Sequence, residues 1–252
     1  MINWINLRTI KYFIVLNKYK ITIGMVTCCF FLTTLGVIVS RQLAPVDKWI
    51  AAFDVALRSL CVPKNRQTQR CSPAHGISEP ELSAEEKRHV AGLMRVNHAG
   101  EVCAQALYQG QALTAQLATV KDQMTAAALE EVDHLAWCEE RLHDLHYAPG
   151  LLNPIWYSGS FMIGLLAGCL GDRWSLGFVA ETERQVTAHL KKHLEHIPSQ
   201  DKKTHAILSQ MQQDETQHAE TAQRAGAVEL PFLVRKCMSV VSKIMTKTSY
   251  YF

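Results

Sequence analysis

Apolar and polar positions divide most of the chain into long stretches without helix breakers. From residue 81 onward, proline falls only in the gaps between these stretches. They lack the apolar–polar alternation of β-branched residues that is typical of a half-buried strand. The stretches are 84–118, 119–147, 155–197 and 199–226. Four long helices predict an all-α fold, and specifically a helix bundle.

Local signals indicate where these helices begin and end. Ser83 and Glu86 match the S-x-x-E pattern of a capping box, which predicts a helix start. Thr119 is a candidate start for the second helix, and Ser199 is a candidate for the fourth. Gly226 is a plausible stop for the last bundle helix.

The N-terminal region contains an apolar segment, residues 21–39, which is uncharged and just long enough to cross a bilayer as a helix. Basic residues precede it, and the first acid of the chain is Asp47, an asymmetry that favours a cytoplasmic N-terminus. Three interpretations stay open: a signal anchor, a cleaved signal peptide, or an upstream extension, since Met25 lies inside the segment.

Three regions follow from these patterns. Residues 1–40 are an N-terminal apolar extension or anchor. Residues 41–80 contain an amphipathic helix over 41–60 and then a proline-containing linker. Residues 81–252 form the bundle domain.

Two further stretches suggest contact with a membrane surface. Residues 145–171 contain no Asp, Glu, Lys or Arg, which fits either a buried helical hairpin or an interfacial helix with Trp156 and Tyr157 at headgroup depth. The tail 230–252 interleaves basic and apolar residues. Such tails bind anionic membranes, but packing on the bundle with solvated charges explains the pattern equally well.

Composition narrows the class of protein. The chain is 48% hydrophobic and 19% charged, with a formal net charge of +3. These values exclude a disordered or collagen-like chain, and the positive charge is too small for a dedicated nucleic-acid binder. The eight cysteines include no C-x-x-C pair, so neither a zinc site nor a disulfide framework is indicated. Reduced thiols favour a cytoplasmic face, which conflicts with an anchor that exports the rest of the chain.

The pattern E-x-x-H places a glutamate and a histidine on one helix face, where both can bind one metal ion. Four copies occur, whereas fewer than one is expected by chance from 15 Glu and 11 His. Two copies lie among other charged residues, at Glu86 and Glu140, and are expected to be solvated. The other two are D/E-E-x-x-H patterns in less charged surroundings. They supply Glu131, His134, Glu215 and His218.

Two further glutamates complete a repeated arrangement. Glu101 is the only charged residue between Val96 and Val120, and a lone buried carboxylate is costly unless it is paired or metal-bound. Glu183 is the analogous acid of the third helix, with Glu181 as the alternative. Two helix pairs that each give one Glu and then one E-x-x-H predict the di-metal carboxylate site of a four-helix bundle. This ligand set suits iron or manganese.

Other side chains are candidates for the surroundings of this site. Glu130 and Asp214 each precede an E-x-x-H glutamate and could orient a ligand histidine on another helix. Tyr108 lies two turns after Glu101, on roughly the same helix face, so it is either a hydrogen-bonding neighbour or a core tyrosine.

At these residues the chain resembles the bacterial demethoxyubiquinone hydroxylases of ubiquinone biosynthesis. The similar stretches are RVNHAGEVCAQALYQGQ, EEVDHL, AETERQVTAHL and DETQHAE, and LAPVDKWIAAFDVALRSL resembles the opening of the bacterial members. The resemblance covers roughly residues 41–252. It implies a ferritin-like four-helix di-iron bundle with added interfacial helices. The implied ligands are Glu101, Glu131, His134, Glu183, Glu215 and His218, and His189 matches the family's helix-three histidine, which favours Glu183 over Glu181.

The resemblance also implies a function. The expected enzyme is a di-iron monooxygenase with two iron ions per chain, which hydroxylates a polyprenyl methoxy-benzoquinol with O₂. An electron donor that the sequence does not identify, the lipid surface, and other ubiquinone-biosynthesis proteins are the expected partners. The expected location is the cytoplasmic side of the cell membrane, bound peripherally. The rivals are another di-iron oxygenase or oxidase, an iron-storage protein of the ferritin type, and a membrane anchor with a decayed site.

Overall fold

The structure is a computed structural model that describes residues 2–7, 10–17, 20–27, 45–61 and 66–252. The chain divides into two compact units, Met1–Leu43 and Ala44–Phe252. Each unit is considered by itself below.

The first unit contains a three-stranded antiparallel sheet in the order β1 (Ile2–Leu7), β2 (Ile10–Asn17) and β3 (Lys20–Thr27). Strand β3 takes up residues 21–27 of the segment for which a helix was considered, and its many β-branched residues favour a strand. Residues 28–39 of that segment lie outside the described part of the chain, so the role of 1–40 stays a prediction. Among the described residues, no helix combines the length and the apolar character needed to cross a bilayer.

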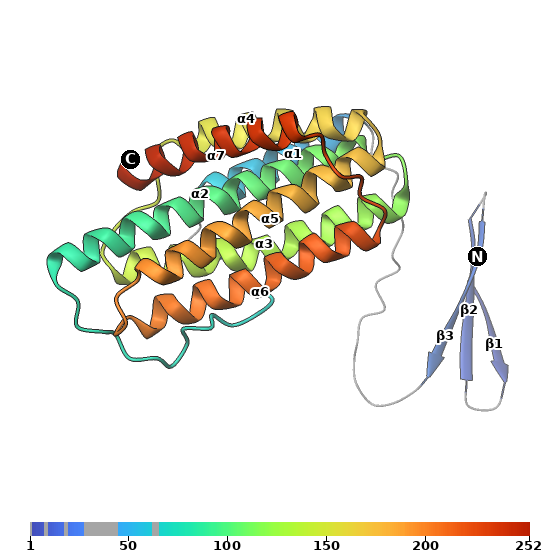
Figure 1. Cartoon of the computed structure of the whole chain (residues 1–252). Helices are drawn as coiled ribbons and strands as arrows, with labels where there is room; N and C mark the ends of the chain where they lie inside the picture. Colours follow the sequence, from blue (N-terminus) through green and yellow to red (C-terminus); the bar gives the residue numbers. More distant parts are fainter. Residues whose placement is uncertain (1, 8–9, 18–19, 28–44, 62–65) are drawn as a thin grey trace. The chain divides into compact units, whose positions relative to one another are not determined.

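Every regular element described in the second unit is a helix, as predicted. The helices are α1 (Pro45–Leu60), α2 (Ala84–Thr114), α3 (Ala118–Asp144), α4 (Asn153–Cys169), α5 (Asp172–His196), α6 (Lys202–Arg224) and α7 (Phe232–Tyr251). Helices α2 and α3 pack as one pair and α5 and α6 as another, and together they form the four-helix bundle (Figure 1). Helices α4 and α7 pack mainly on α2, and α1 contacts both α2 and α4.

The helix starts agree only in part with the sequence signals. Both hydrogen bonds of the capping box at Ser83 are present. The prediction at Thr119 was wrong, because α3 begins after Leu117, which gives no side-chain cap. The prediction at Ser199 was also wrong: Asp201 caps α6, because its carboxylate accepts a main-chain hydrogen bond from the first turn.

The predicted segment 155–197 forms two helices, α4 and α5, rather than one. The break falls at Gly171, whose φ of 104° lies in a region that side chains other than glycine rarely adopt. The buried carboxylate of Asp172 accepts main-chain hydrogen bonds from Gln116 at 3.0 Å and Leu117 at 2.8 Å. These bonds fix the start of α5 against the connection between α2 and α3.

Glycine also allows α4 to lie very close to α2. A Cβ atom built on Gly164 would come within 2.3 Å of the main-chain oxygen of Leu107. The α4 face toward α2 is therefore buried, while Ile155, Met162 and Leu166 on its other side are exposed.

The apolar core has two main clusters along the bundle. One includes Met94, Trp137 and Leu208, and the other includes Tyr108 and Leu176. On each of the four bundle helices, the predicted ligands fall between the residues of these two clusters in sequence. The charged residues are thus enclosed by apolar packing at both ends.

Candidate metal centre

The structure brings the six predicted ligands together at the centre of the bundle. Glu101 comes from α2, Glu131 and His134 from α3, Glu183 from α5, and Glu215 and His218 from α6. They form two groups of four whose candidate ligand atoms lie within 4.8 Å of one another. The groups are Glu101, Glu131, His134 and Glu215, and Glu131, Glu183, Glu215 and His218.

The two groups overlap in Glu131 and Glu215. Each of the other four residues belongs to one group. One carboxylate from α3 and one from α6 are therefore placed between two clusters of ligands, which is the arrangement needed to hold two cations side by side.

Both histidines turn Nδ1 toward these shared carboxylates. His134 Nδ1 lies 3.0 Å from Glu131 Oε2 and 3.0 Å from Glu215 Oε1. His218 Nδ1 lies 3.2 Å from Glu215 Oε2 and 3.3 Å from Glu131 Oε1. Burial alone lowers the pKa of His218, but these carboxylates outweigh it and raise the pKa to about 12. The centre therefore favours bound positive charge strongly.

The carboxylates respond to their surroundings in opposite directions. Burial, together with the charge of neighbouring glutamates, raises the pKa of Glu101 and of Glu183 well above the ordinary value. Burial also disfavours the charge of Glu131 and Glu215, but the histidines outweigh it and lower both pKa values. The two imidazoles compensate only two of the four buried carboxylates, so ionisation of Glu101 and Glu183 as well requires further cations at the centre.

Two buried carboxylate oxygens further indicate that these residues can bind metal ions. Glu131 Oε1 and Glu215 Oε1 are buried, and neither accepts a well-aligned hydrogen bond among the described residues. Buried oxygens without such a partner are costly, and a cation bound by both groups would satisfy them. Carboxylate oxygens with some imidazole nitrogen suit iron and manganese better than soft metals.

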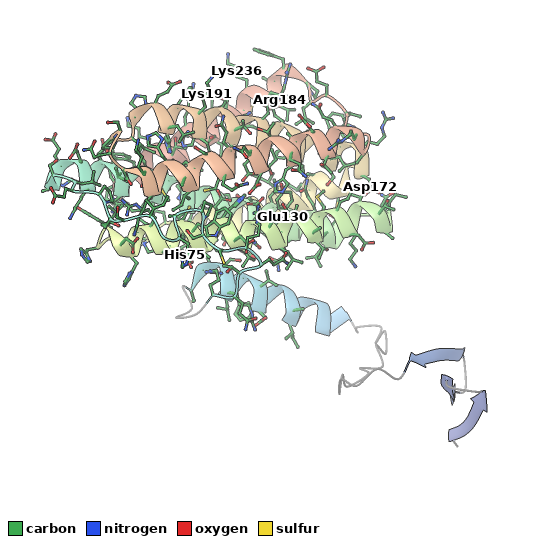
Figure 2. The ribbon with its side chains drawn as sticks, turned by 90° about the horizontal axis from the view of Figure 1, so that it is seen from below. His75, Glu130, Asp172, Arg184, Lys191 and Lys236 are labelled. Carbon is green, nitrogen blue, oxygen red and sulfur yellow. The ribbon has the colours of Figure 1, made fainter. Side chains whose placement is uncertain are left out.

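Asp214 and Glu130, the two acids predicted to orient ligand histidines, each contact the Nε2 atom of one histidine. His134 Nε2 lies 2.9 Å from Asp214 Oδ2, and His218 Nε2 lies 2.9 Å from Glu130 Oε2. Figure 2 shows Glu130 where α3 and α6 run next to each other. A carboxylate at the far nitrogen fixes the ring orientation and increases the basicity of the nitrogen that faces the metal.

The other two predicted neighbours differ from each other. The Tyr108 hydroxyl donates a hydrogen bond to Glu183 Oε1, so it is both a core residue and a direct partner of the cluster. His189 makes none of the contacts described for the cluster. Its ring packs on His193 with the centroids 3.9 Å apart, and burial lowers its pKa to about 4.

The remaining E-x-x-H pairs lie away from the cluster, as expected. Glu86 belongs to the capping box of α2, and His89 Nδ1 is 2.7 Å from the Tyr250 hydroxyl. Glu140 and His143 are exposed.

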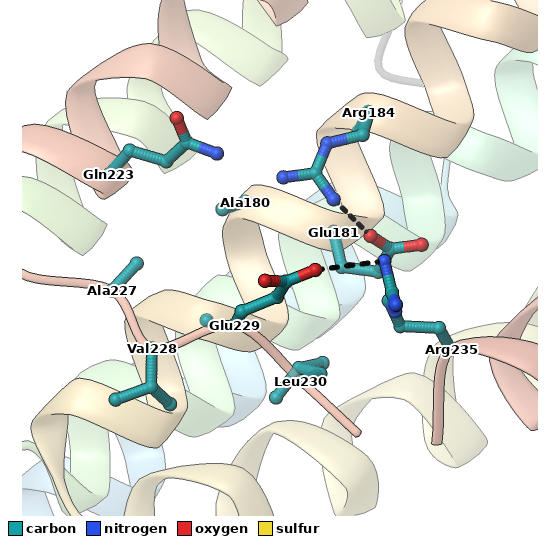
Figure 3. Close-up of a pocket in the computed structure, with 10 residues that line it drawn as sticks. Ala180, Glu181, Arg184, Gln223, Ala227, Val228, Glu229, Leu230 and Arg235 are labelled. Carbon is teal, nitrogen blue, oxygen red and sulfur yellow. Dashed lines mark hydrogen bonds and ion pairs between the residues drawn. The ribbon is translucent and has the colours of Figure 1, made fainter. Parts of the chain in front are cut away.

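Glu181, the alternative to Glu183, lines a separate pocket of about 680 Å³ between α5 and the connection from α6 to α7. Figure 3 shows Glu181 beside Arg184, and their ion pair measures 2.5 Å. Arg235 pairs with Glu229 at 3.2 Å in the same pocket. The choice of Glu183 for the cluster therefore agrees with the geometry.

Several residues near the centre have no counterpart in the sequence-based prediction. Arg70 and Asp133 are the main examples, because Arg70 contacts both Asp133 and Asp214. The position of Asp133 between Glu131 and His134 was the only available signal. Arg70 lies in the segment interpreted as a linker, where no periodicity marks a contact with the bundle.

Comparisons with known proteins agree with this geometry. Residues 88–249 match the family model described as ubiquinone biosynthesis protein COQ7. The 3-demethoxyubiquinol 3-hydroxylase of Legionella pneumophila strain Paris is 64% identical over 206 residues, which cover 82% of this chain and 97% of that protein. The 3-demethoxyubiquinol 3-hydroxylase of Acinetobacter baylyi is 57% identical over 211 residues, which cover 84% of this chain and 99% of that protein.

The family match covers all four bundle helices from residue 88 of α2 onward, and so includes all six residues of the cluster. These agreements identify the chain as a member of the ubiquinone biosynthesis protein COQ7 family.

Proposed function

We propose that the protein is a monooxygenase that hydroxylates the ring of a polyprenyl methoxy-benzoquinol, demethoxyubiquinol, with O₂. Two iron ions at the centre of the bundle would be its cofactor. The observation that supports the proposal most directly is the overlap of two four-residue groups in Glu131 and Glu215. The names of the bacterial relatives, 3-demethoxyubiquinol 3-hydroxylase, supply the substrate class.

The six residues divide naturally between two ions. Glu101 and His134 would hold one ion and Glu183 and His218 the other, and the shared carboxylates Glu131 and Glu215 would serve both. The bound iron pair would supply the electrons and the open coordination positions that allow O₂ to react with an electron-rich ring. The protein contributes the fixed positions of the ligands and their enclosure by apolar packing.

Tyr108 holds a proton at the edge of the centre. Burial and the charge of Glu183 raise the pKa of Tyr108 well above its ordinary value, so its hydroxyl stays protonated. The hydroxyl donates to Glu183 Oε1 and thereby restricts the rotation of that carboxylate. The aromatic ring also excludes water from this end of the cluster.

A polyprenyl substrate resides in a lipid bilayer, and one part of the helical unit is suited to contact a bilayer surface. Leu166 on α4 is 63% exposed, and Phe232 on α7 is 70% exposed. Basic residues Lys236, Lys243 and Lys247 on α7 are exposed as well. Apolar side chains together with lysines favour binding to anionic lipid surfaces. Peripheral attachment through α4 and α7 is therefore part of the proposal. The cytoplasmic side is proposed because reduced thiols favour it.

A vesicle-binding experiment tests this attachment. Leu166→Lys should weaken binding to vesicles that contain phosphatidylglycerol, because it places a charge where an apolar side chain would enter the interface. Gln213→Lys adds the same charge at an exposed position on α6 and should leave binding unchanged. Equal binding of both variants and wild type would contradict attachment through α4.

The metal content tests the centre itself. Purified protein should contain two irons per chain, and Glu215→Ala should lose them because Glu215 belongs to both groups. Glu220→Ala removes an exposed carboxylate from the same helix and should retain both irons. Retention of both metals by Glu215→Ala would refute the ligand set.

A further inference from the structure

The connection between α1 and α2 is not a free linker. Its residues 66–79, which we call the strap, run without regular structure along the outer side of α3 and α6 (Figure 1). At one end, Arg66 forms two hydrogen bonds with Glu139 of α3, at 2.8 and 2.6 Å. At the other end, Glu79 pairs with Arg141 of α3 at 2.8 Å and with Lys203 of α6 at 2.9 Å. The strap is therefore fixed to both helices.

Arg70 lies between these two attachments and reaches toward the metal centre. Its Nε is 3.1 Å from Asp133 Oδ2, and its Nη1 is 2.8 Å from Asp214 Oδ2. The guanidinium lies over the ring of Trp137, 4.9 Å from the ring centroid. The main-chain nitrogen of Gln69 donates to Asp133 Oδ1 at 2.7 Å, which fixes the strap at this point. One guanidinium thus joins a carboxylate of α3 to a carboxylate of α6.

The oxygen that Arg70 contacts on α6 is also the oxygen that orients a candidate ligand. Asp214 Oδ2 lies 2.8 Å from Arg70 Nη1 and 2.9 Å from His134 Nε2. The other oxygen of Asp214 accepts a hydrogen bond from Gln210 at 2.9 Å. With both oxygens held, the carboxylate has a single orientation, and His134 Nδ1 is kept pointing at the shared glutamates.

The second histidine has no equivalent support. Its orienting acid, Glu130, has a side chain that is 46% exposed, and its one ion-pair partner among the described residues is His218. The two halves of the centre, one around His134 and one around His218, therefore differ: the acid that orients His134 is paired with a cation from the strap, whereas the acid that orients His218 is exposed to solvent. The strap also precedes residue 88, where the match to the family model begins.

We propose that Arg70 is a positioning residue for the His134 half of the metal centre, and that the strap holds Arg70 in contact with Asp214. The proposal rests on the proposed metal centre. Removal of the guanidinium frees Asp214 to turn toward solvent and leaves His134 able to rotate away from the ligand position. The ion held by Glu101 and His134 should then bind more weakly, and the ion held by Glu183 and His218 should be affected little.

Metal-free protein can be titrated with Co²⁺ while the absorption of the bound ion is recorded. This titration measures the affinity for each of the two ions without relying on activity. Loss of a residue that orients a ligand histidine typically weakens metal binding about 10- to 100-fold. Arg70→Gln should therefore weaken one of the two Co²⁺ equivalents by about 10-fold. Arg70→Lys keeps the charge and one contact and should recover part of the loss. Arg66→Gln is the matched control, since it removes a strap arginine whose partner, Glu139, orients no candidate ligand.

The outcomes separate the role of Arg70 from the metal centre and from stability. A selective loss of one equivalent in Arg70→Gln, with Arg66→Gln unchanged, supports the proposal. Wild-type affinity in Arg70→Gln overturns it, and so does an equal loss in Arg66→Gln, which would make the strap merely structural. Wild-type protein that binds no Co²⁺ would overturn the metal centre itself and the role of Arg70 with it. Circular dichroism of each variant verifies that the helices are intact.

Discussion

Arg141 is a buried cation that ties together the two helices bearing the E-x-x-H pairs. Its guanidinium is fully buried on α3 and contacts Asp201, the buried N-cap residue of α6, at 3.0 Å. It also donates to Thr204 at 2.8 Å and to Glu79 of the strap at 2.8 Å. We predict that Arg141→Met strongly destabilises the folded protein, because it leaves the charge of Asp201 buried without a cationic partner.

The expected loss of stability depends on which ion-pair partners of Arg141 water can reach after the substitution. Glu79 is 42% exposed and loses little when its partner is removed. Asp201 is fully buried, and an uncompensated buried charge costs about 3–5 kcal/mol. Asp201→Asn removes the charge but can still cap the helix, so the double variant Arg141→Met/Asp201→Asn should recover about 2 kcal/mol.

Chemical denaturation followed by circular dichroism measures the free energy of unfolding of each variant. Arg58→Met is the control, because Arg58 and its partner Asp54 are exposed and solvent screens such a pair, so its loss should leave the free energy of unfolding nearly unchanged. A loss below about 1 kcal/mol in Arg141→Met, or no recovery in the double variant, would refute the reasoning.

Three further predictions concern packing, titration and thiol reactivity. Gly164→Ala should destabilise the protein by about 1–3 kcal/mol in thermal unfolding, because the new Cβ meets the main chain of α2, whereas Gly159→Ala, with open space around it, should not destabilise. Burial lowers the pKa of His193 to about 3 from 6.5, so the unfolded chain binds its proton first as pH falls. Protonation of His193 should by itself lower the free energy of unfolding by about 2 kcal/mol between pH 6.5 and about pH 5, and His193→Gln should reduce the pH dependence by this amount in urea unfolding; an unchanged slope would contradict the assignment. Burial raises the pKa of Cys103 to about 11, so iodoacetamide should modify the exposed Cys237 and spare Cys103 in the folded protein, and mass spectrometry showing equal labelling would contradict this.

The centre could be anticipated from the sequence because its signals are local. A carboxylate such as Glu101 in an otherwise uncharged helix is costly, and each E-x-x-H places two ligands on one helix face. The adjacent acids Glu130 and Asp214 were found for the same reason. The resemblance to a known family then selected Glu183 over Glu181, which periodicity alone had left open.

The features that escaped prediction depend on contacts distant in sequence or on backbone conformation. Arg70 meets Asp214 across 144 positions of sequence, and no local pattern marks such a pair. Gly171 interrupts a long apolar stretch because its backbone turns with positive φ, whereas the glycines inside α4 continue that helix. The cap of α6 at Asp201 rather than Ser199 is decided by the buried contact with Arg141.

A single-turnover reaction under ¹⁸O₂ tests the proposed function most directly. Protein loaded with ferrous iron would be mixed with demethoxyubiquinol and ¹⁸O₂, and the quinone products would be analysed by mass spectrometry. The reduced iron pair supplies the electrons, so the unidentified donor is not needed. We predict a hydroxylated product that carries one ¹⁸O atom, and no such product from Glu215→Ala. Unreacted substrate in the loaded wild-type protein, or a hydroxyl oxygen that comes from water, would contradict the proposed monooxygenase.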